Sequence, residues 1–244
     1  MKFLGIIPVR YASTRFPGKP LIDIQGKSMI QHVYEQAKKS KKLAEVFVAT
    51  DDKRIEVHVK SFGGNVIMTS AKHKSGTDRC AEAAKKIKGK FDVVINIQGD
   101  EPFIKPQQID LLCSCFKSRE VEIATLVKKI KATDELLNPN TPKVILNRNK
   151  EAIYFSRTPV PFYRNEADHI EWLKKRDYYK HIGIYAYRIG TLKNLAALKP
   201  SPLEITESLE QLRWIENGYT IVTAVTQAES LAIDTPEDLQ RLVY

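Results

Sequence analysis

The stretch FLGIIPVRYASTRFPGKP (residues 3–20) passes from a short apolar run directly into a loop of basic and hydroxyl residues. A compact apolar run such as FLGIIPV (3–9) is typical of a strand that is buried on both faces of a parallel sheet. Parallel sheets bind their ligands at the carboxyl ends of the strands. The loop RYASTRFPGKP (10–20) is therefore the first place where we expect a binding site.

Strand-like and helix-like segments alternate along the first hundred residues. The strand-like runs after the first are EVFVAT (45–50), NVIMTS (65–70) and DVVINIQ (92–98), and helical patterns cover 28–40, 53–62 and 77–87. This alternation predicts an α/β fold with a mostly parallel sheet and helices on both faces.

The second half of the chain is less regular. Strand-like runs cover 124–130, 143–147, 152–156 and 181–188, and helical patterns cover 207–217 and 236–243. We expect one domain over residues 1–244. An inserted, partly antiparallel region at about 130–190 would form a lid or a dimer surface.

The chain carries a formal net charge of +10, which makes nucleic acid or a small anionic substrate a candidate partner. Much of the excess lies in scattered lysine runs, namely KKSKK (38–42), KKIKGK (85–90), KKIK (128–131) and KKR (174–176). Such scattered runs indicate solvated surface. No recognition-helix or RNA-binding signature supports a nucleic-acid partner.

Location and redox state follow from two further features. No apolar stretch approaches the roughly 20 residues that span a bilayer, so we expect a cytoplasmic protein without membrane insertion. The three cysteines, Cys80, Cys113 and Cys115, form no disulfide or zinc pattern, and we expect reduced thiols.

The loop after the first strand has the composition of a triphosphate site. Arg10, Arg15 and Lys19 supply positive charge, Ser13 supplies a hydroxyl, and Gly18 lets the backbone approach phosphate oxygens. Neither a Walker A loop nor a dinucleotide fingerprint is present. The alternative is a basic surface loop without a ligand.

Two carboxylates each close an apolar strand. Asp100 follows the strand in INIQGDEP (95–102), and Asp234 follows the one in LAIDTPEDL (231–239). Oxygen ligands of this kind suit Mg²⁺ that is shared with a phosphate, so the pair predicts one metal site. The alternative is that each residue serves only a turn or the start of a helix.

The segment KHKSGTD (72–78) lies between a predicted strand and a predicted helix. His73, Lys74 and Ser75 there are candidates for contact with a base or ribose. The alternative is a plain turn in which Thr77 or Asp78 caps the helix.

A last set of polar residues lies in the second half of the chain. Arg157 in SRTPVP (156–161) is suited to pair with a carboxylate in a bidentate fork. The candidates for reading sugar hydroxyls are His181, Tyr185, Glu210 and Gln211. Taken singly, each of these residues is equally compatible with a structural or solvated role.

Together the motifs resemble the family of 3-deoxy-manno-octulosonate cytidylyltransferases, also called CMP-Kdo synthetases. The resembling strings span nearly the whole chain in order: IIPVRYASTRFPGKPL, VATDD, SGTDR, VINIQGDEP, NPNTPKV, AIYFSRTPVP, HIGIYAYR, PLEITESLEQLRW and IDTPEDL. The combination is far more specific than any one motif.

The resemblance implies a Rossmann-like nucleotide-diphospho-sugar transferase fold, a homodimer, Mg²⁺ dependence and a role in bacterial lipopolysaccharide biosynthesis. It implies that CMP passes from CTP to 3-deoxy-D-manno-octulosonate (Kdo). An 8-amino-Kdo or sialic acid is the alternative acceptor.

The same resemblance assigns roles to residues. The nucleotide would contact Arg10, Ser13, Arg15, Lys19, His73, Lys74, Ser75 and Gln98. The sugar would face Gln98, Arg157, His181, Tyr185, Glu210 and Gln211. Asp100 and Asp234 would ligate magnesium, and with Lys19 they would form the catalytic set.

Overall fold

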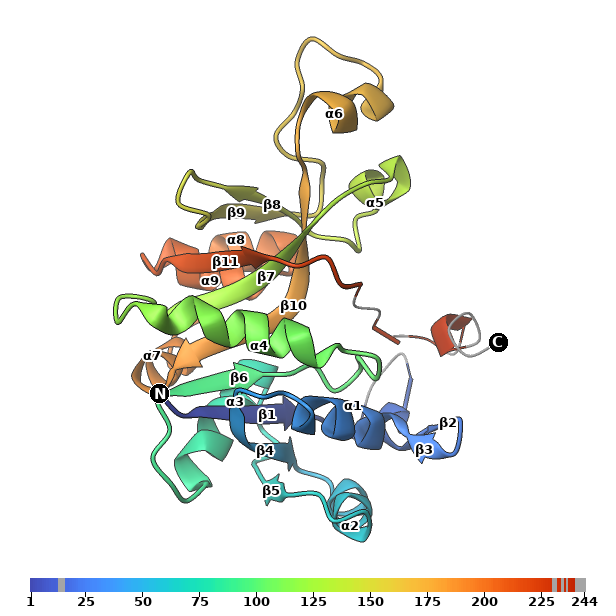
Figure 1. Cartoon of the computed structure of the whole chain (residues 1–244), viewed down its shortest axis with the longest axis vertical. Helices are drawn as coiled ribbons and strands as arrows, with labels where there is room; N and C mark the ends of the chain where they lie inside the picture. The colour runs from blue at the N-terminus through green and yellow to red at the C-terminus, as the bar shows by residue number, and fades with distance from the viewer. Residues whose placement is uncertain (13–15, 230–231, 234, 236, 240–244) are drawn as a thin grey trace. The chain divides into compact units, whose positions relative to one another are not determined.

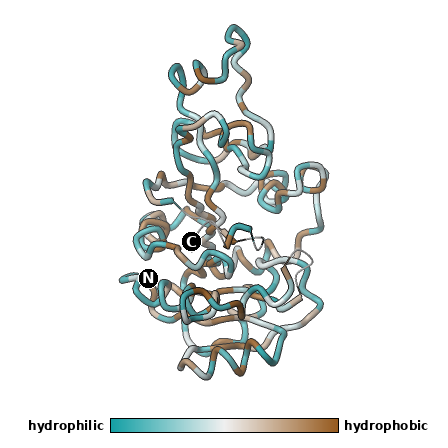
Figure 2. The backbone as a smooth tube through the Cα atoms, turned by 90° about the vertical axis from the view of Figure 1, so that its right-hand side faces the viewer, coloured by the Kyte–Doolittle hydropathy of each residue, from teal (hydrophilic) through white to brown (hydrophobic). Residues whose placement is uncertain are grey.

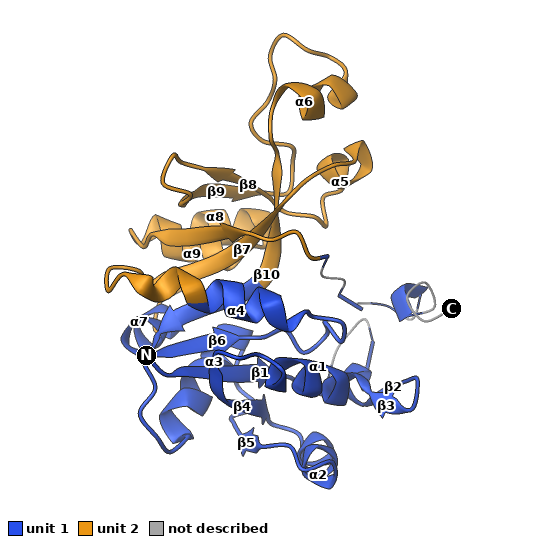
Figure 3. Cartoon of the chain, viewed as in Figure 1, with its two compact units in different colours: residues 1–113, 184–196, 229–244 blue, residues 114–183, 197–228 orange. Residues whose placement is uncertain are grey.

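The computed structural model describes residues 1–12, 16–229, 232–233, 235 and 237–239 (Figure 1). The chain divides into two compact units (Figure 3). Unit 1 comprises residues 1–113, 184–196 and 229–244, and unit 2 comprises residues 114–183 and 197–228. The region predicted as an insertion, about 130–190, falls mostly within unit 2.

Unit 1 is built on a mostly parallel sheet. Its strands are β1 (Phe3–Pro8), β4 (Leu43–Thr50), β5 (Val66–Met68), β6 (Val93–Asn96) and the last part of β10 (Tyr179–Arg188). Strand β1 pairs in parallel with both β4 and β6, β4 pairs in parallel with β5, and only β10 runs antiparallel to β6. The predicted mostly parallel sheet is therefore confirmed.

The central strands of unit 1 are buried on both faces. Successive residues of a strand point to opposite faces, and residues 3–7 of β1 and 93–96 of β6 are all buried. A continuous apolar sequence is what a doubly covered parallel strand requires. The strand ends then reach solvent together, which places the loops after β1 and β6 at one edge of the sheet.

The helices of unit 1 begin where side chains can cap them. They are α1 (Met29–Lys38), α2 (Lys53–Ser61), α3 (Gly76–Lys86), α4 (Pro106–Ser114) and α7 (Ile189–Ala196), with a short hairpin of β2 (Asp23–Ile24) and β3 (Lys27–Ser28) before α1. Ser28 caps α1 and Asp52 caps α2, each accepting a backbone N–H. Helix α3 packs against β1, β6 and α7.

Unit 2 combines a parallel pair with an antiparallel hairpin. Strand β7 (Ile123–Lys129) pairs in parallel with β11 (Ile221–Val225). Strands β8 (Lys143–Leu146) and β9 (Ala152–Ser156) form the hairpin, and the start of β10 adds to β8 in the antiparallel sense. The helical segments are η2 (Cys115–Lys117), α5 (Thr133–Leu137), α6 (His169–Lys175), α8 (Pro202–Glu207) and α9 (Gln211–Glu216).

An aromatic cluster holds α6 in unit 2. Trp172 stacks on Tyr178 with ring centroids 6.0 Å apart and packs with Ile130 and Leu136. The Trp172 indole N–H donates to Glu166 O at 2.8 Å, so its polar atom is satisfied inside the cluster. The tip that carries α6 is otherwise mostly hydrophilic (Figure 2).

Two helical predictions differ from the structure. The pattern over 207–217 predicts one helix, but Ser208 adopts a left-handed conformation (φ 52°) that ends α8, and α9 begins at Gln211. The pattern over 236–243 lies largely outside the described residues. Helices α4, α5, α6 and α7 have no counterpart among the predicted helices.

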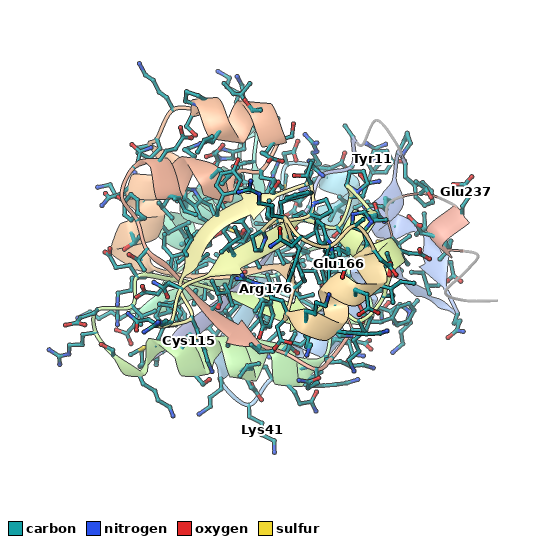
Figure 4. The ribbon with its side chains drawn as sticks, turned by 90° about the horizontal axis from the view of Figure 1, so that it is seen from above. Tyr11, Lys41, Cys115, Glu166, Arg176 and Glu237 are labelled. Carbon is teal, nitrogen blue, oxygen red and sulfur yellow. The ribbon has the colours of Figure 1, made fainter. Side chains whose placement is uncertain are left out.

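Surface charge follows the sequence prediction where it is described. Lys41, in the first lysine run, is exposed and points away from the ribbon (Figure 4). The three cysteines form no disulfide in the structure, and Cys80 and Cys113 are buried. Among the described residues, no helix combines the length and the apolar character that a membrane crossing demands.

Candidate functional site

The loop after β1 is closed by its own backbone. The Gly18 N–H donates to Tyr11 O at 3.1 Å, and Gly18 adopts a left-handed conformation with φ 74°. A Cβ at Gly18 would lie 3.1 Å from the Tyr11 hydroxyl, so glycine fits both the dihedral angle and the space. Lys19 follows as the first residue of the short helix η1 (Lys19–Leu21).

Arg54, which is not among the sequence candidates, covers the ring of Tyr11. The Arg54 guanidinium carbon lies 3.3 Å from the centroid of the Tyr11 ring. Arg54 in turn makes two hydrogen bonds to Asp52, of 2.9 and 2.6 Å, which lower the pKa of that carboxyl. Asp52, in the string VATDD, therefore contacts the candidate phosphate loop through Arg54 and Tyr11. The spacing of these residues in the sequence does not predict this contact.

The structure brings Lys19 and Asp100 together. The Lys19 Nζ donates to Asp100 Oδ2 at 2.9 Å, with side-chain exposures of 13% and 29%. Asp100 lies in the turn after β6, where Glu101 N donates to Gln98 O at 3.4 Å. A cation and a carboxylate thus meet at the carboxyl ends of two adjacent parallel strands.

Gly99 sets how closely this turn approaches β1. A Cβ at Gly99 would lie 2.2 Å from Val9 Cγ1 and 3.2 Å from Pro8 O. No larger residue fits without a shift of the turn, because the nearer neighbour is a buried side chain close to the backbone. Glycine in the QGDEP string therefore fixes the position of Asp100.

Three predicted residues, Ser13, Arg15 and Asp234, lie outside the described residues. Beside the last of them, Ile233 N donates to Asp100 O at 2.9 Å. The structure therefore ties Ile233 to the turn that carries Asp100.

The chemistry of the donor set fits Mg²⁺ at Asp100. Asp100 Oδ1 accepts no hydrogen bond from the described residues, and Oδ2 is partly exposed beside Lys19. Within the described ranges, no cluster of three or more His, Cys, Asp or Glu residues is present. Magnesium in phosphate-transfer sites uses one or two carboxylates together with waters and phosphate oxygens, so a single described carboxylate suffices as an anchor.

The loop 72–78 presents a helix start rather than free side chains. Ser75 caps α3, in place of the expected Thr77 or Asp78: its Oγ accepts from Asp78 N at 3.1 Å, and Asp78 Oδ2 accepts from Ser75 N at 3.3 Å. His73 pairs with Glu82. The pKa of Glu82 falls to about 2 because of Lys86, the Ser70 N–H and His73.

The remaining candidates of unit 1 differ in exposure. Arg10 and Lys74 are exposed, and Gln98 is half-buried. Tyr185 is buried on β10 and stacks on Tyr187 with ring centroids 5.9 Å apart. Arg10 is thus accessible to an anion, whereas Tyr185 is enclosed.

Arg157, in unit 2, is held by three backbone carbonyls. Its Nε donates to Glu207 O at 2.6 Å, its Nη1 to Pro139 O at 2.9 Å and its Nη2 to Ser208 O at 3.2 Å. A guanidinium has five N–H donors, so one remains on each terminal nitrogen. Arg157 is therefore oriented before any ligand arrives, with donors left for one.

The carboxylate of Glu207 completes this arrangement. It accepts from Arg157 N at 2.9 Å, from Ser156 Oγ at 3.0 Å and from Tyr154 Oη at 3.4 Å. Lys143, whose Nζ donates to Arg157 O, is fully buried. Neither Glu207 nor Lys143 is among the sequence candidates, because hydrogen-bond partners 50 or more residues apart, such as Glu207 and Arg157, leave no local signal in a sequence.

His181 is neutral in the folded protein. Its Nε2 lies 3.0 Å from Thr125 Oγ1, and its ring meets Phe155 edge-on at 5.2 Å. Exclusion of water from the ring lowers the pKa of His181 to about 3. At neutral pH the ring therefore serves as a hydrogen-bonding group and not as a charge.

Gln211 and Glu210 lie at the start of α9. Gln211 is buried, and its Nε2 has no hydrogen-bond partner among the described residues. Burial of an unpaired amide costs about 1–3 kcal/mol, so such an atom points to a ligand or a water. Glu210 is half-buried at the N-terminal end of the helix.

The comparisons with known proteins agree with this arrangement. Residues 4–221 match the family model described as cytidylyltransferase, which covers most of the chain. The Lys19–Asp100 pair lies after the carboxyl ends of parallel strands, where α/β sheets of this kind bind ligands.

Close relatives narrow the class. The 3-deoxy-manno-octulosonate cytidylyltransferase of Parabacteroides distasonis is 57% identical over 245 residues, covering 99% of this chain and 96% of the relative. Its counterpart from Bacteroides thetaiotaomicron is 58% identical over 243 residues, covering 98% and 96%. The solved structure of a CMP:2-keto-3-deoxy-manno-octonic acid synthetase complexed with CTP matches with a TM-score of 0.91 and 45% identity, covering 99% and 97%. The chain belongs to the 3-deoxy-manno-octulosonate cytidylyltransferases, and the predicted fold class is confirmed.

Proposed function

We propose that this chain transfers CMP from CTP to Kdo and releases pyrophosphate. The observation that carries the proposal is the Lys19–Asp100 pair at the ends of β1 and β6, in a chain more than half identical to enzymes named for this reaction. The chain keeps in order every string on which the resemblance rests.

In the reaction, the anomeric hydroxyl of Kdo attacks the α-phosphorus of CTP. The new O–P bond forms as the bond to pyrophosphate breaks, and the hydroxyl proton passes to solvent. Phosphoryl transfer depends mainly on positioning and on neutralising charge. Lys19 and Arg10 hold the negative oxygens of the triphosphate and stabilise the pyrophosphate as it leaves.

Mg²⁺, when bound, neutralises phosphate charge and lowers the pKa of the attacking hydroxyl. Asp100 would hold it, with Asp234 as the second predicted ligand. Lys19 donates to Asp100 and would turn to phosphate oxygens when CTP enters. Asp100 is then left as an uncompensated carboxylate, which favours cation binding.

Two residues of unit 2 offer hydrogen-bond donors to the acidic sugar. Arg157 offers its remaining N–H groups to the Kdo carboxylate, and Gln211 offers its unpaired Nε2 to a sugar oxygen. His181, Tyr185, Glu210 and Gln98 are the further predicted sugar contacts. A neutral His181 reads hydroxyl groups without competing for the carboxylate.

Three further properties belong to this proposal because of family resemblance: a homodimer, a cytoplasmic location and a role in lipopolysaccharide biosynthesis. Size-exclusion chromatography with light scattering tests the first. A mass near 56 kDa supports a dimer of the 27.8 kDa chain, and a mass near 28 kDa contradicts it.

A pyrophosphate-release assay with CTP, Mg²⁺ and Kdo tests the function. We expect release with CTP and Kdo together, and little with either alone or with ATP, GTP or UTP. Sialic acid and 8-amino-Kdo, offered in parallel, test the alternative acceptors. Release with sialic acid but not with Kdo would overturn the sugar assignment.

A further inference from the structure

Lys143 is a buried lysine without a carboxylate partner. It is 0% exposed, and its Nζ donates to Asn138 O at 2.9 Å and to Arg157 O at 2.5 Å. No described carboxylate lies within ion-pair distance of this nitrogen. A buried charge without a counter-ion is costly, so its retention calls for an explanation.

The position of Lys143 is fixed by the sheet of unit 2. Lys143 pairs with Ser156 on β9 and with Lys180 on β10, so the three side chains share one face. Lys180 is itself neutralised by Glu135. One backbone oxygen that Lys143 binds belongs to Asn138, next to Pro139, and the other belongs to Arg157 itself.

The charges around Lys143 leave a positive excess. Arg157 and Glu207 are the charged groups that act on Lys143, and Glu207 is already engaged by Arg157 N and Ser156. Burial, reinforced by Arg157 and opposed by Glu207, lowers the pKa of Lys143 to about 8. The site is therefore preorganised for an incoming anion. The charge of Lys143 changes around pH 8, where enzyme activity can be measured.

We propose that Lys143 is a positioning residue for Arg157: its ammonium ion joins the backbones at Asn138 and Arg157 and so holds the guanidinium ready for the carboxylate of the acidic sugar. Pro139 O, an acceptor of Arg157, follows directly on Asn138, so the segment that Lys143 fixes also orients the guanidinium. The inference rests on the proposed function, since it concerns the sugar of that reaction.

The first arm of the test compares Lys143→Met and Lys143→Arg with Lys174→Met, an exposed lysine on α6 that pairs with Glu171. Methionine keeps the buried stem and loses the charge. At pH 7.5 we expect the KM for Kdo to rise roughly tenfold or more in Lys143→Met, with the KM for CTP within about twofold. We expect Lys174→Met to match the unmodified enzyme and Lys143→Arg, where it folds, to recover part of the loss.

The second arm uses the unmodified enzyme, so it does not depend on a variant that folds. A lowered pKa means that the ammonium form is present below pH 8 and is lost above it. We expect the KM for Kdo to rise severalfold between pH 7.5 and 9.5, with little change in the KM for CTP. The rise should be absent in Lys143→Met, whose KM is already high, and reduced in Lys143→Arg.

The outcomes separate the two proposals. An unmodified enzyme that releases pyrophosphate, with a KM for Kdo that is flat to pH 9.5 and unchanged in Lys143→Met, overturns the role of Lys143 alone. An equal rise of both KM values in Lys143→Met also overturns it, because that result indicates general loosening. No pyrophosphate release with any acidic sugar overturns the proposed function, and this inference with it.

Discussion

Lys19 in unit 1 and Lys143 in unit 2 are the same residue type in opposite surroundings. Lys19 pairs with a carboxylate near the carboxyl ends of the strands, whereas Lys143 is fully buried and, among the described residues, bonds only to backbone oxygens. A partly exposed pair can exchange one partner for another, while a fully buried ammonium is held in one geometry. The comparison indicates that Lys19 in unit 1 changes its partner when the ligand binds, whereas the side chains of the unit 2 site already have their binding geometry.

The largest effect is expected when the Lys19–Asp100 pair of unit 1 is broken. Asp100→Asn removes the carboxylate that would anchor Mg²⁺ and that accepts a hydrogen bond from Lys19. We expect turnover to fall roughly a thousandfold, with an unchanged far-UV circular dichroism spectrum. Asp177→Asn, at an exposed acid that pairs with Lys129, is the matched control. Near-normal turnover of Asp100→Asn would remove this residue from the metal site.

The second largest effect is expected when the preorganised guanidinium of unit 2 is removed. Arg157→Ala removes the guanidinium and leaves three backbone carbonyls without a donor. We expect the KM for Kdo to rise about 10- to 100-fold. Arg157→Lys should recover little, because a point charge cannot make the same set of hydrogen bonds. An unchanged KM for Kdo would contradict the sugar-binding role.

The third effect tests how the turn of Asp100 is placed. Gly99→Ala puts a methyl group 2.2 Å from Val9 Cγ1, so we expect a loss of about 1–3 kcal/mol in the free energy of unfolding. Gly190→Ala, whose Cβ would meet no atom within 4 Å, is the control and should be near neutral. Urea denaturation measures both. In the double variant Val9→Ala, Gly99→Ala, part of the loss should return; no recovery would contradict the contact.

The fourth prediction concerns His181 and pH. Its folded pKa of about 3 lies below the unfolded value of 6.5, so the unfolded chain binds a proton first as the pH falls. The contribution is complete above pH 6.5 and is lost progressively down to about pH 3. Between pH 6.5 and 5, the fall in unfolding free energy should be shallower in His181→Asn than in the unmodified protein. Identical slopes would show that the ring is not held neutral.

The smallest expected effect tests whether the Arg54–Tyr11 contact supports the phosphate loop. Arg54→Ala removes the cation that covers the Tyr11 ring, a weak contact at an exposed site. We expect the KM for CTP to rise two- to fivefold and the KM for Kdo to stay unchanged. Arg54→Lys should behave similarly if stacking matters, and should resemble the unmodified enzyme if charge alone matters.

The strands and the polar loops of unit 1 were predictable because they are local. A continuous apolar run such as β6 marks a doubly buried strand, and Asp100 at its end follows from sequence order. The helical pattern over 207–217 failed because periodicity carries no information on a single left-handed residue, Ser208. The site of unit 2 is harder to predict from the sequence because it depends on hydrogen bonds between residues that are distant in the chain.

Lys143 illustrates what a sequence leaves out. A lysine at the start of KVIL has the pattern of a solvated strand end, yet the side chain is fully buried. Its burial arises from the packing of β8 between β9 and β10, which no window around residue 143 contains. Arg157 was found as a candidate by motif, but its three carbonyl partners were not.

Calorimetric titration of CTP with Mg²⁺, in the absence of sugar, tests the division between the two units most directly. The account predicts that Lys19→Met loses at least tenfold in CTP affinity, whereas Arg157→Ala binds CTP within twofold of the unmodified protein. Equal losses in the two variants, or a loss in Arg157→Ala alone, would contradict it.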